Sequence, residues 1–250
     1  MTDDDDVMEL RKTHKAVKAV LFDLDGTLLD TESLSDKATI EAFGNSLPHL
    51  IREERRQDGD RLPWEIKKEI LGKQGEDWVP MVISYAQKTW GVNSNIRANQ
   101  LWNNWEMNLN SFCKDVKECE GATKLIKMLV EKGIPIAIAT SSRTISVQKK
   151  RLRHEHIFQP MTTIVTGDDP LVKKGKPAPD IYLEAARRLG IKPEDCLVFE
   201  DSISGCQSGK AAGCAVIAVL DSRMEKSIFD EISDQVLDNL NEFDPAAWGL

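Results

Sequence analysis

Residues 19–28 read AVLFDLDGTL, an apolar run that leads two carboxylates directly into a glycine turn. Such a run before a turn is typical of a buried β-strand. Alternate side chains of an extended chain point to the same side, so Asp23 and Asp25 lie together at the strand's end. Two like charges held there normally require a cation to offset their repulsion. A plain strand followed by an Asp-Gly turn uses the same residues, so this segment alone leaves both interpretations open.

Three later segments place further polar groups at expected strand ends. Residues 134–143 read IPIAIATSSR and end in hydroxyls, and residues 196–205 read CLVFEDSISG and contain two acids after the apolar run. Between them, GKPAPD at residues 175–180 carries Lys176, and the prolines that follow it stiffen its approach. Hydroxyls, backbone N–H groups and a lysine suit phosphate oxygens. Each segment has an ordinary structural explanation when taken alone, but the four together predict one Mg²⁺-dependent phosphoryl site.

In order and spacing, these segments resemble the four motifs of the haloacid dehalogenase-like (HAD) phosphohydrolases. The resemblance implies that Asp23 attacks phosphorus to form an aspartyl phosphate. It implies that Asp25 is the general acid and then the general base, with a pKa raised by its acidic neighbours. The implied phosphate ligands are Thr140, the Ser141 amide and Lys176. The implied Mg²⁺ ligands are Asp23, the backbone carbonyl of Asp25 and Asp201, with Glu200 as inner or outer support.

Within this family, the chain is most similar to a eukaryotic group that includes pseudouridine-5′-phosphatase and glycerol-phosphate phosphatase-like proteins. The likeness rests on ATSSR (139–143), GDDP (167–170) and GKPAPDIYL (175–183), and it thins between residues 46 and 61. It implies hydrolysis of a small phosphate ester. The expected substrate is pseudouridine 5′-phosphate or a similar sugar, nucleoside or polyol phosphate.

The sequence after residue 121 alternates between helical and strand-like patterns. We expect strands at 18–22, 135–139, 162–166, 196–199 and 215–219, and helices at 123–131, 144–154, 181–189 and 204–212. Such alternation predicts β-α-β crossovers, a parallel sheet and an α/β fold, with ligands outside the carboxyl ends of the strands. The expected architecture is a Rossmann-like HAD core (residues 1–32 and 118–250) with an inserted all-helical cap domain (residues 33–117).

The expected cap is rich in tryptophan. Five of the chain's six tryptophans lie there: Trp64, Trp78, Trp90, Trp102 and Trp105. We expect them to form the core of the cap, and a place for one of them at the substrate pocket stays open. Lys73, in LGKQG at 71–75, is either part of a substrate-specificity loop or a surface lysine beside a helix-end glycine. The mixed-charge run at 52–61 is predicted to be a solvated loop.

Arg143 and the pair His154 and His156 each leave two interpretations open. Arg143 directly follows the hydroxyl segment and reaches either the substrate or a structural ion-pair partner. The two histidines have a spacing compatible with a metal site. A charged helix end is favoured for them, because no partner ligand of metal spacing lies near them in the sequence.

Composition limits the partners and the location. A formal net charge of −8 at pH 7 argues against nucleic acid, because binding a polyanion needs an excess of basic residues. No run approaches the ~20 apolar residues of a membrane span, and residues 1–6 lack the features of a signal peptide. The five cysteines contain no C-x-x-C pair and fit reduced thiols. We therefore expect a cytoplasmic monomer that acts on a small phosphate ester, without nucleic-acid or membrane partners.

Three other functions use a similar chain. A phosphosugar mutase of the β-phosphoglucomutase type usually carries an arginine in the cap loop for a second phosphate, and residues 74–76 contain none. A non-catalytic binding module would be expected to lose the catalytic residues, and here they are present. A dehalogenase is disfavoured because the acids at positions 25, 200 and 201 suit Mg²⁺ and phosphate. Phosphatase activity is the favoured prediction.

Overall fold

A computed structural model describes residues 17–70, 75–92, 95–221 and 223–250. The strands are β1 (Ala19–Phe22), β2 (Ile136–Thr140), β3 (Thr163–Thr166), β4 (Cys196–Glu200), β5 (Ala215–Val219) and β6 (Gln235–Leu237). The first five α-helices are α1 (Thr31–Ala42), α2 (His49–Gln57), α3 (Trp64–Ile70), α4 (Gly75–Thr89) and α5 (Ala98–Phe112). The others are α6 (Ala122–Glu131), α7 (Thr144–Arg151), α8 (Glu155–Phe158), α9 (Asp180–Leu189) and α10 (Ile203–Ala211). Short 3₁₀ helices lie at Gly44–Ser46, Cys113–Asp115, Pro193–Asp195, Lys226–Phe229, Leu240–Glu242 and Pro245–Trp248.

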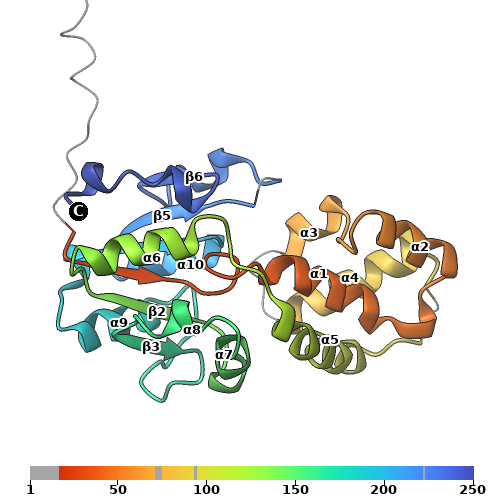
Figure 1. Cartoon of the computed structure of the whole chain (residues 1–250). Coiled ribbons are helices and arrows are strands. Elements are labelled where there is room, and N and C mark those ends of the chain that lie inside the picture. The colour runs from red at the N-terminus through yellow and green to blue at the C-terminus, as the bar shows by residue number, and fades with distance from the viewer. Residues whose placement is uncertain (1–16, 71–74, 93–94, 222) are drawn as a thin grey trace, which may run out of the picture.

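The strands form one parallel sheet in the order β3-β2-β1-β4-β5-β6. β1 lies inside the sheet, with Phe22 opposite Ile138 of β2 and Phe199 of β4. Because the paired strands all run the same way, their carboxyl ends lie along one edge. In Figure 1 this edge faces helices α1 to α5. The predicted α/β fold with a parallel sheet is confirmed.

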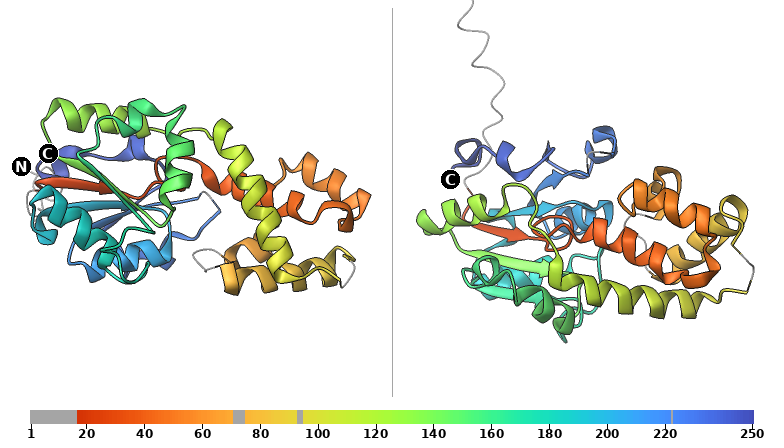
Figure 2. Two further views of the ribbon diagram at one scale, coloured as in Figure 1. Left: turned by 90° about the horizontal axis from the view of Figure 1, so that it is seen from below. Right: turned by 45° about the vertical axis from the view of Figure 1, so that its right-hand side comes forward.

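Helices cover both faces of the sheet (Figure 2). Alternation along β1 sends Val20 and Phe22 into one hydrophobic core and Ala19 and Leu21 into another. The first core includes α6, α8 and the C-terminal segment with the buried Trp248, and the second includes α9 and α10. A parallel sheet that is covered on both faces needs apolar side chains at every strand position, which explains why AVLF is completely buried.

Helices α1 to α5 form a second, all-helical unit with a hydrophobic core of its own. Phe43 and Tyr85 both pack edge-on against Trp90 within it. Two linkers join this unit to the sheet, and they pair with each other. The Asp30 amide donates to the Lys117 carbonyl at 2.9 Å, directly before α1 begins. None of the described helices is both long and apolar enough to cross a membrane.

Three local expectations differ from the structure. The predicted solvated loop at 52–61 is wrong for its first part, because α2 continues to Gln57. A run of alternating charges is also compatible with a helix that faces solvent, where opposite charges one turn apart stabilise each other. The helix expected at 144–154 ends at Arg151, and the separate short helix α8 follows. β6, with only three residues, was not predicted.

Candidate active site

The carboxyl edge of the sheet brings the predicted segments together around one buried lysine. Lys176 lies in the connection between β3 and α9, and its Nζ donates to Asp23 Oδ1, after β1, at 2.5 Å. The same ammonium donates to Glu200 Oε1 at 2.6 Å and to the Ala139 carbonyl at 3.2 Å. Lys176 therefore connects the ends of β1, β2 and β4.

Asp201 joins this group from the turn after β4. Gly26 has a φ of +90°, and a Cβ atom there would lie 2.1 Å from Asp201 Oδ2. Only glycine fits this conformation and this close approach. The Thr27 hydroxyl donates to Asp201 Oδ1 at 3.2 Å. The glycine and threonine of the D-L-D-G-T segment thus hold an acid from the turn after β4 against the loop after β1.

The acids at this edge carry more negative charge than Lys176 offsets. Burial, with the charges of Glu200 and Asp25, raises the pKa of Asp23 to about 7 against the opposing effect of Lys176. Burial and the charges of Glu200 and Asp23 also raise the pKa of Asp201 well above its usual value. A cation beside Asp23 and Asp201 would lower both values. Carboxylate oxygens suit a hard cation, so the residue types present at this edge fit Mg²⁺.

Asp25 belongs to a different set of contacts. Lys150, on α7, forms an ion pair with Asp25 Oδ1. The hydroxyls of Ser142 and Thr140 donate to Asp25 Oδ2 at 2.7 and 3.2 Å. Burial opposes the charge of Asp25, but Lys150 and the hydrogen bonds from Ser142 and Thr31 outweigh it and hold the pKa below its usual value. The prediction that acidic neighbours raise this pKa is therefore wrong.

Two of the predicted site residues, Thr140 and Glu200, are more deeply buried than expected for direct ligands of phosphate or metal. Thr140 is completely buried, and its hydroxyl accepts from the Ser142 amide while it donates to Asp25. Glu200 is completely buried as well. Its Oε1 accepts from Lys176 and from the Tyr182 hydroxyl, and its Oε2 accepts from the Asp201 and Ser202 amides. With both oxygens engaged by protein donors, Glu200 is placed to support Lys176 and the β4 turn from behind.

A cleft of about 720 Å³ lies between this edge and the helical unit. Its sheet side is lined by seven of the predicted site residues: Asp23, Asp25, Thr140, Ser141, Arg143, Lys176 and Asp201. Ser141 and Arg143 are exposed there, whereas Glu200 does not line the cleft. Lys73, predicted as a substrate contact, lies outside the described residues.

The opposite side of the cleft carries an aromatic cluster from the helical unit. Trp78 of α4 and Trp102 and Trp105 of α5 line it, with the Trp105 ring centroid 5.3 Å from that of Trp78 and 4.9 Å from that of Trp102. Trp105 Nε1 is buried and has no hydrogen-bond partner among the described residues. The tryptophans of the helical unit therefore both pack within it and line the cleft.

Lys150 is the main site residue that the sequence analysis missed. The sequence does indicate that Lys150 faces inward, because it lies three residues after the buried Val147 and thus on the same face of α7. Ser142 was quoted with its segment but given no role, although it binds both Asp25 and Lys150. Nothing in the local pattern marks Tyr182, whose contact with Glu200 depends on the packing of α9 against the sheet.

Known proteins are similar to this chain in sequence and in fold. The profile of one family, haloacid dehalogenase-like hydrolase, matches residues 17–213. The chain is 36% identical over 238 residues to the mitochondrial (DL)-glycerol-3-phosphatase 1 of Arabidopsis thaliana, covering 94% of this chain and 74% of that protein. It is 32% identical over 245 residues to a probable pseudouridine-5′-phosphatase of Drosophila melanogaster, covering 96% of each. A solved HAD hydrolase of family IA, variant 3, from Entamoeba histolytica superposes with a TM-score of 0.72 at 27% identity, covering 93% of this chain and 98% of that one.

The chain therefore belongs to the haloacid dehalogenase-like hydrolases. Its named relatives are phosphatases of small phosphorylated metabolites, and it is an enzyme of this class.

Proposed function

We propose that the protein is an Mg²⁺-dependent phosphomonoesterase that works through an aspartyl phosphate on Asp23. The observation that carries this proposal is the group of Asp23, Asp201 and Lys176 that lines the cleft. It supplies a carboxylate nucleophile, oxygen ligands for a cation and an ammonium for phosphoryl oxygens. The relatives named as phosphatases support the same class of reaction.

Asp23 is the nucleophile in this mechanism. Mg²⁺ bound by Asp23, the Asp25 backbone carbonyl and Asp201, with Glu200 as outer support, would offset the negative charge of the carboxylates and of the phosphate. Asp23 is then ionised at neutral pH and attacks phosphorus, which forms the aspartyl phosphate and releases the alkoxide. Lys176 and the Ser141 amide bind the phosphoryl oxygens, and Arg143 is placed at the cleft for the rest of the substrate.

Asp25 transfers the protons. It protonates the departing alkoxide and then takes a proton from the water that attacks the aspartyl phosphate. The ion pair with Lys150 favours charged Asp25, which suits the second step. A bound phosphate places negative charge nearby and raises the pKa of Asp25, which favours the protonated form that the first step needs. Thr140 and Ser142 fix the orientation of the carboxylate throughout.

We assign substrate selection to the helical unit, as a cap domain of residues 33–117 on a core of residues 1–32 and 118–250. Helix α1 begins at Thr31, so the division falls within two residues of a helix start. The rings of Trp78, Trp102 and Trp105 suit a flat, partly apolar group, and the indole N–H of Trp105 suits a polar acceptor on it. Pseudouridine 5′-phosphate carries both features and is the first-choice substrate, ahead of related sugar, nucleoside and polyol phosphates.

Phosphate release across a small panel of esters tests the proposal. The panel contains pseudouridine 5′-phosphate, uridine 5′-phosphate, glycerol 3-phosphate and several hexose phosphates, each with Mg²⁺ and with a chelator. We expect Mg²⁺-dependent release that is fastest with pseudouridine 5′-phosphate and is lost in Asp23→Asn. No release from any ester by the wild-type protein would contradict phosphatase activity. A preference for glycerol 3-phosphate would leave the chemistry intact and change the substrate.

A phosphosugar mutase remains the alternative function, because it uses the same carboxylates at the core. Isomerisation of β-glucose 1-phosphate without net phosphate release would favour it.

We also propose that the protein acts as a cytoplasmic monomer. Its five unpaired cysteines, which fit a reducing compartment, support the location, and sedimentation analysis tests the monomer.

A further inference from the structure

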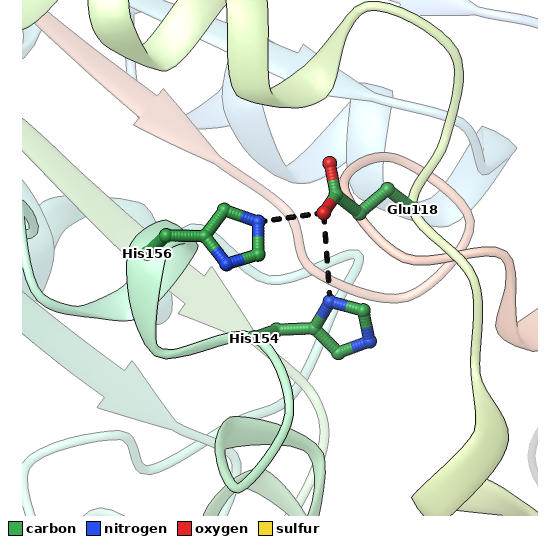
Figure 3. Close-up of side chains that lie close together, drawn as sticks. All are labelled: Glu118, His154 and His156. Atoms are coloured by element: carbon green, nitrogen blue, oxygen red, sulfur yellow. Dashed lines mark hydrogen bonds and ion pairs between the residues drawn. The ribbon is translucent and has the colours of Figure 1, made fainter.

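Glu118, His154 and His156 come together (Figure 3), and none of them is among the residues that line the cleft. Glu118 lies in the linker that leads from the helical unit to α6, His154 directly precedes α8, and His156 is in α8. One ligand atom from each of the three side chains lies within 4.8 Å of the others. The fold thus supplies the third ligand that the sequence analysis did not find beside the two histidines.

His154 has a buried ring nitrogen to which no described residue forms a hydrogen bond. The residue is only 8% exposed, and its Nε2 lies 2.8 Å from the Val116 carbonyl. A carbonyl only accepts, so Nε2 carries the proton and Nδ1 of the neutral ring carries a lone pair. Among the described residues Nδ1 has no hydrogen-bond partner, and Glu118 Oε1 lies 3.7 Å from it. A buried lone pair beside a carboxylate oxygen is costly unless a proton or a metal ion lies between them.

The other two ligands are oriented toward the same point. His156 Nε2 lies 2.6 Å from Glu118 Oε1. The Thr123 hydroxyl donates to the other carboxylate oxygen of Glu118, which leaves Oε1 toward the histidines. Glu118 Oε1 thus faces ring nitrogens of both histidines.

We propose that Glu118, His154 and His156 form a second metal site, specific for a divalent transition-metal ion such as Zn²⁺. Two imidazoles and one carboxylate are typical Zn²⁺ ligands, whereas Mg²⁺ takes oxygen ligands almost exclusively. Ligand atoms about 2.1 Å from a tetrahedral ion lie about 3.4 Å apart. The separation of His154 Nδ1 from Glu118 Oε1, 3.7 Å, is close to that value. The 2.6 Å separation of His156 Nε2 from Glu118 Oε1 is that of a hydrogen bond, which an ion would replace. The Val116 carbonyl on the far nitrogen of His154 is the usual support of a metal-binding histidine.

The position of this site gives it a structural role. Glu118 forms an isolated antiparallel β-bridge with Leu29 of the other linker. The amide of its neighbour Cys119 donates to the Leu28 carbonyl at 2.9 Å. An ion held by Glu118 and the two histidines fastens the α7–α8 turn to the pair of linkers that join the core to the helical unit. The His156 side chain is 46% exposed, so water can reach the remaining coordination position.

Competitive zinc titration of the full chain tests the site. The protein is stripped of metal and kept in excess Mg²⁺, so that the catalytic carboxylates are occupied by the ion they prefer. Zn²⁺ is then titrated against a chromogenic chelator, and Co²⁺ absorption in the visible range gives a second readout. The test variants are His156→Gln and Glu118→Gln. The matched control is His49→Gln, which changes an exposed histidine of α2. A further variant, Asp201→Asn, shows whether zinc binds instead at the carboxylates of the sheet edge. His14 is present in every variant, so any zinc that it binds is common to all.

We expect the wild type, His49→Gln and Asp201→Asn to bind one Zn²⁺ with equal affinity. The affinity of His156→Gln and Glu118→Gln should be at least about tenfold lower, and their Co²⁺ complexes should lose the visible absorption of the wild type. Equal zinc affinity in the wild type and His156→Gln overturns the proposal. An equal loss in His49→Gln, or a loss confined to Asp201→Asn, overturns it as well. Because no readout depends on phosphate release, the result is independent of the proposed function.

Discussion

The two sides of the cleft differ in what holds their residues. On the sheet side, the buried charged groups are held by several contacts, as Lys176 is by Asp23, Glu200 and a backbone carbonyl. On the helical side, aromatic rings pack against one another at an angle, and the Trp105 N–H has no hydrogen-bond partner among the described residues. Fixed charges suit a phosphoryl group that every ester shares, whereas an aromatic wall suits the part in which esters differ. Substitutions on the sheet side should therefore slow the hydrolysis of every substrate, and substitutions on the helical side should change which substrate is preferred.

Asp23→Asn is expected to have the largest effect. It removes the nucleophile, so phosphate release should fall on the order of 10⁴-fold or more with every ester of the panel. Initial rates under saturating Mg²⁺ measure this loss. Asp230→Asn, at an exposed aspartate of the C-terminal region, is the matched control and should retain full activity. Retention of activity by Asp23→Asn, or a loss limited to one ester, would contradict the assignment of this side to shared chemistry.

Lys150→Met should reduce kcat by about 10²-fold, because Lys150 holds the charge and orientation of the proton-transfer group. Without the ion pair the pKa of Asp25 rises, so the limb of the pH–rate profile that reports Asp25 should move to higher pH. Lys149→Met is the matched control, since Lys149 contacts Asn110 on α5 instead of Asp25. An unchanged pH profile in Lys150→Met would show that the ion pair only supports packing.

Trp105→Phe should change selectivity more than turnover. The substitution keeps an aromatic ring and removes the N–H that has no described partner, so the KM of ring-bearing esters should rise about 3- to 10-fold, as expected for one lost hydrogen bond. The KM for glycerol 3-phosphate should stay the same. Trp90→Phe, in the core of the helical unit, is the control. Equal effects on both classes of ester would remove the proposed role of the aromatic wall.

The excess negative charge of the sheet side should be visible as a pH dependence of stability. The pKa of Asp23 rises from 3.8 to about 7 on folding, so the folded, metal-free protein keeps a proton that the unfolded chain has lost. Asp23 therefore contributes stability below about pH 4, and this contribution is lost as the pH rises through about 7. Without metal, the Tm of the wild type minus that of Asp23→Asn should fall by a few degrees between about pH 5 and pH 8.

Mg²⁺ should reverse this trend, because it competes with the proton for the same carboxylates. The rise in Tm on adding Mg²⁺ should be larger at about pH 8 than at about pH 5, and Asp201→Asn should reduce it. A Tm difference between wild type and Asp23→Asn that does not change with pH would show that the carboxylates are already neutralised by protein groups.

Local sequence patterns could predict the sheet side and not the helical side. Strands such as AVLF and IAIAT are recognisable because burial on both faces requires continuous apolar runs, and in a parallel sheet their polar ends must meet at one edge. The positions of side chains on the helical side depend on the rotation of each amphipathic helix about its axis. The sequence does not determine this rotation, so it left open whether Trp105 faces the core or the cleft. The same holds for Glu118, which meets two histidines only through tertiary packing. For α2, the charge pattern fits a solvated loop and a surface helix equally well.

Acid-quench mass spectrometry tests the central claim most directly. The protein is mixed with pseudouridine 5′-phosphate and Mg²⁺, quenched in acid within the first turnover, digested and analysed for phosphorylated peptides. Our account predicts one phosphoryl group on the peptide that contains Asp23, absent without Mg²⁺ and absent in Asp23→Asn. Phosphate release by the wild-type protein with no phosphorylated Asp23 at any quench time, or with the phosphoryl group on another residue, would contradict it.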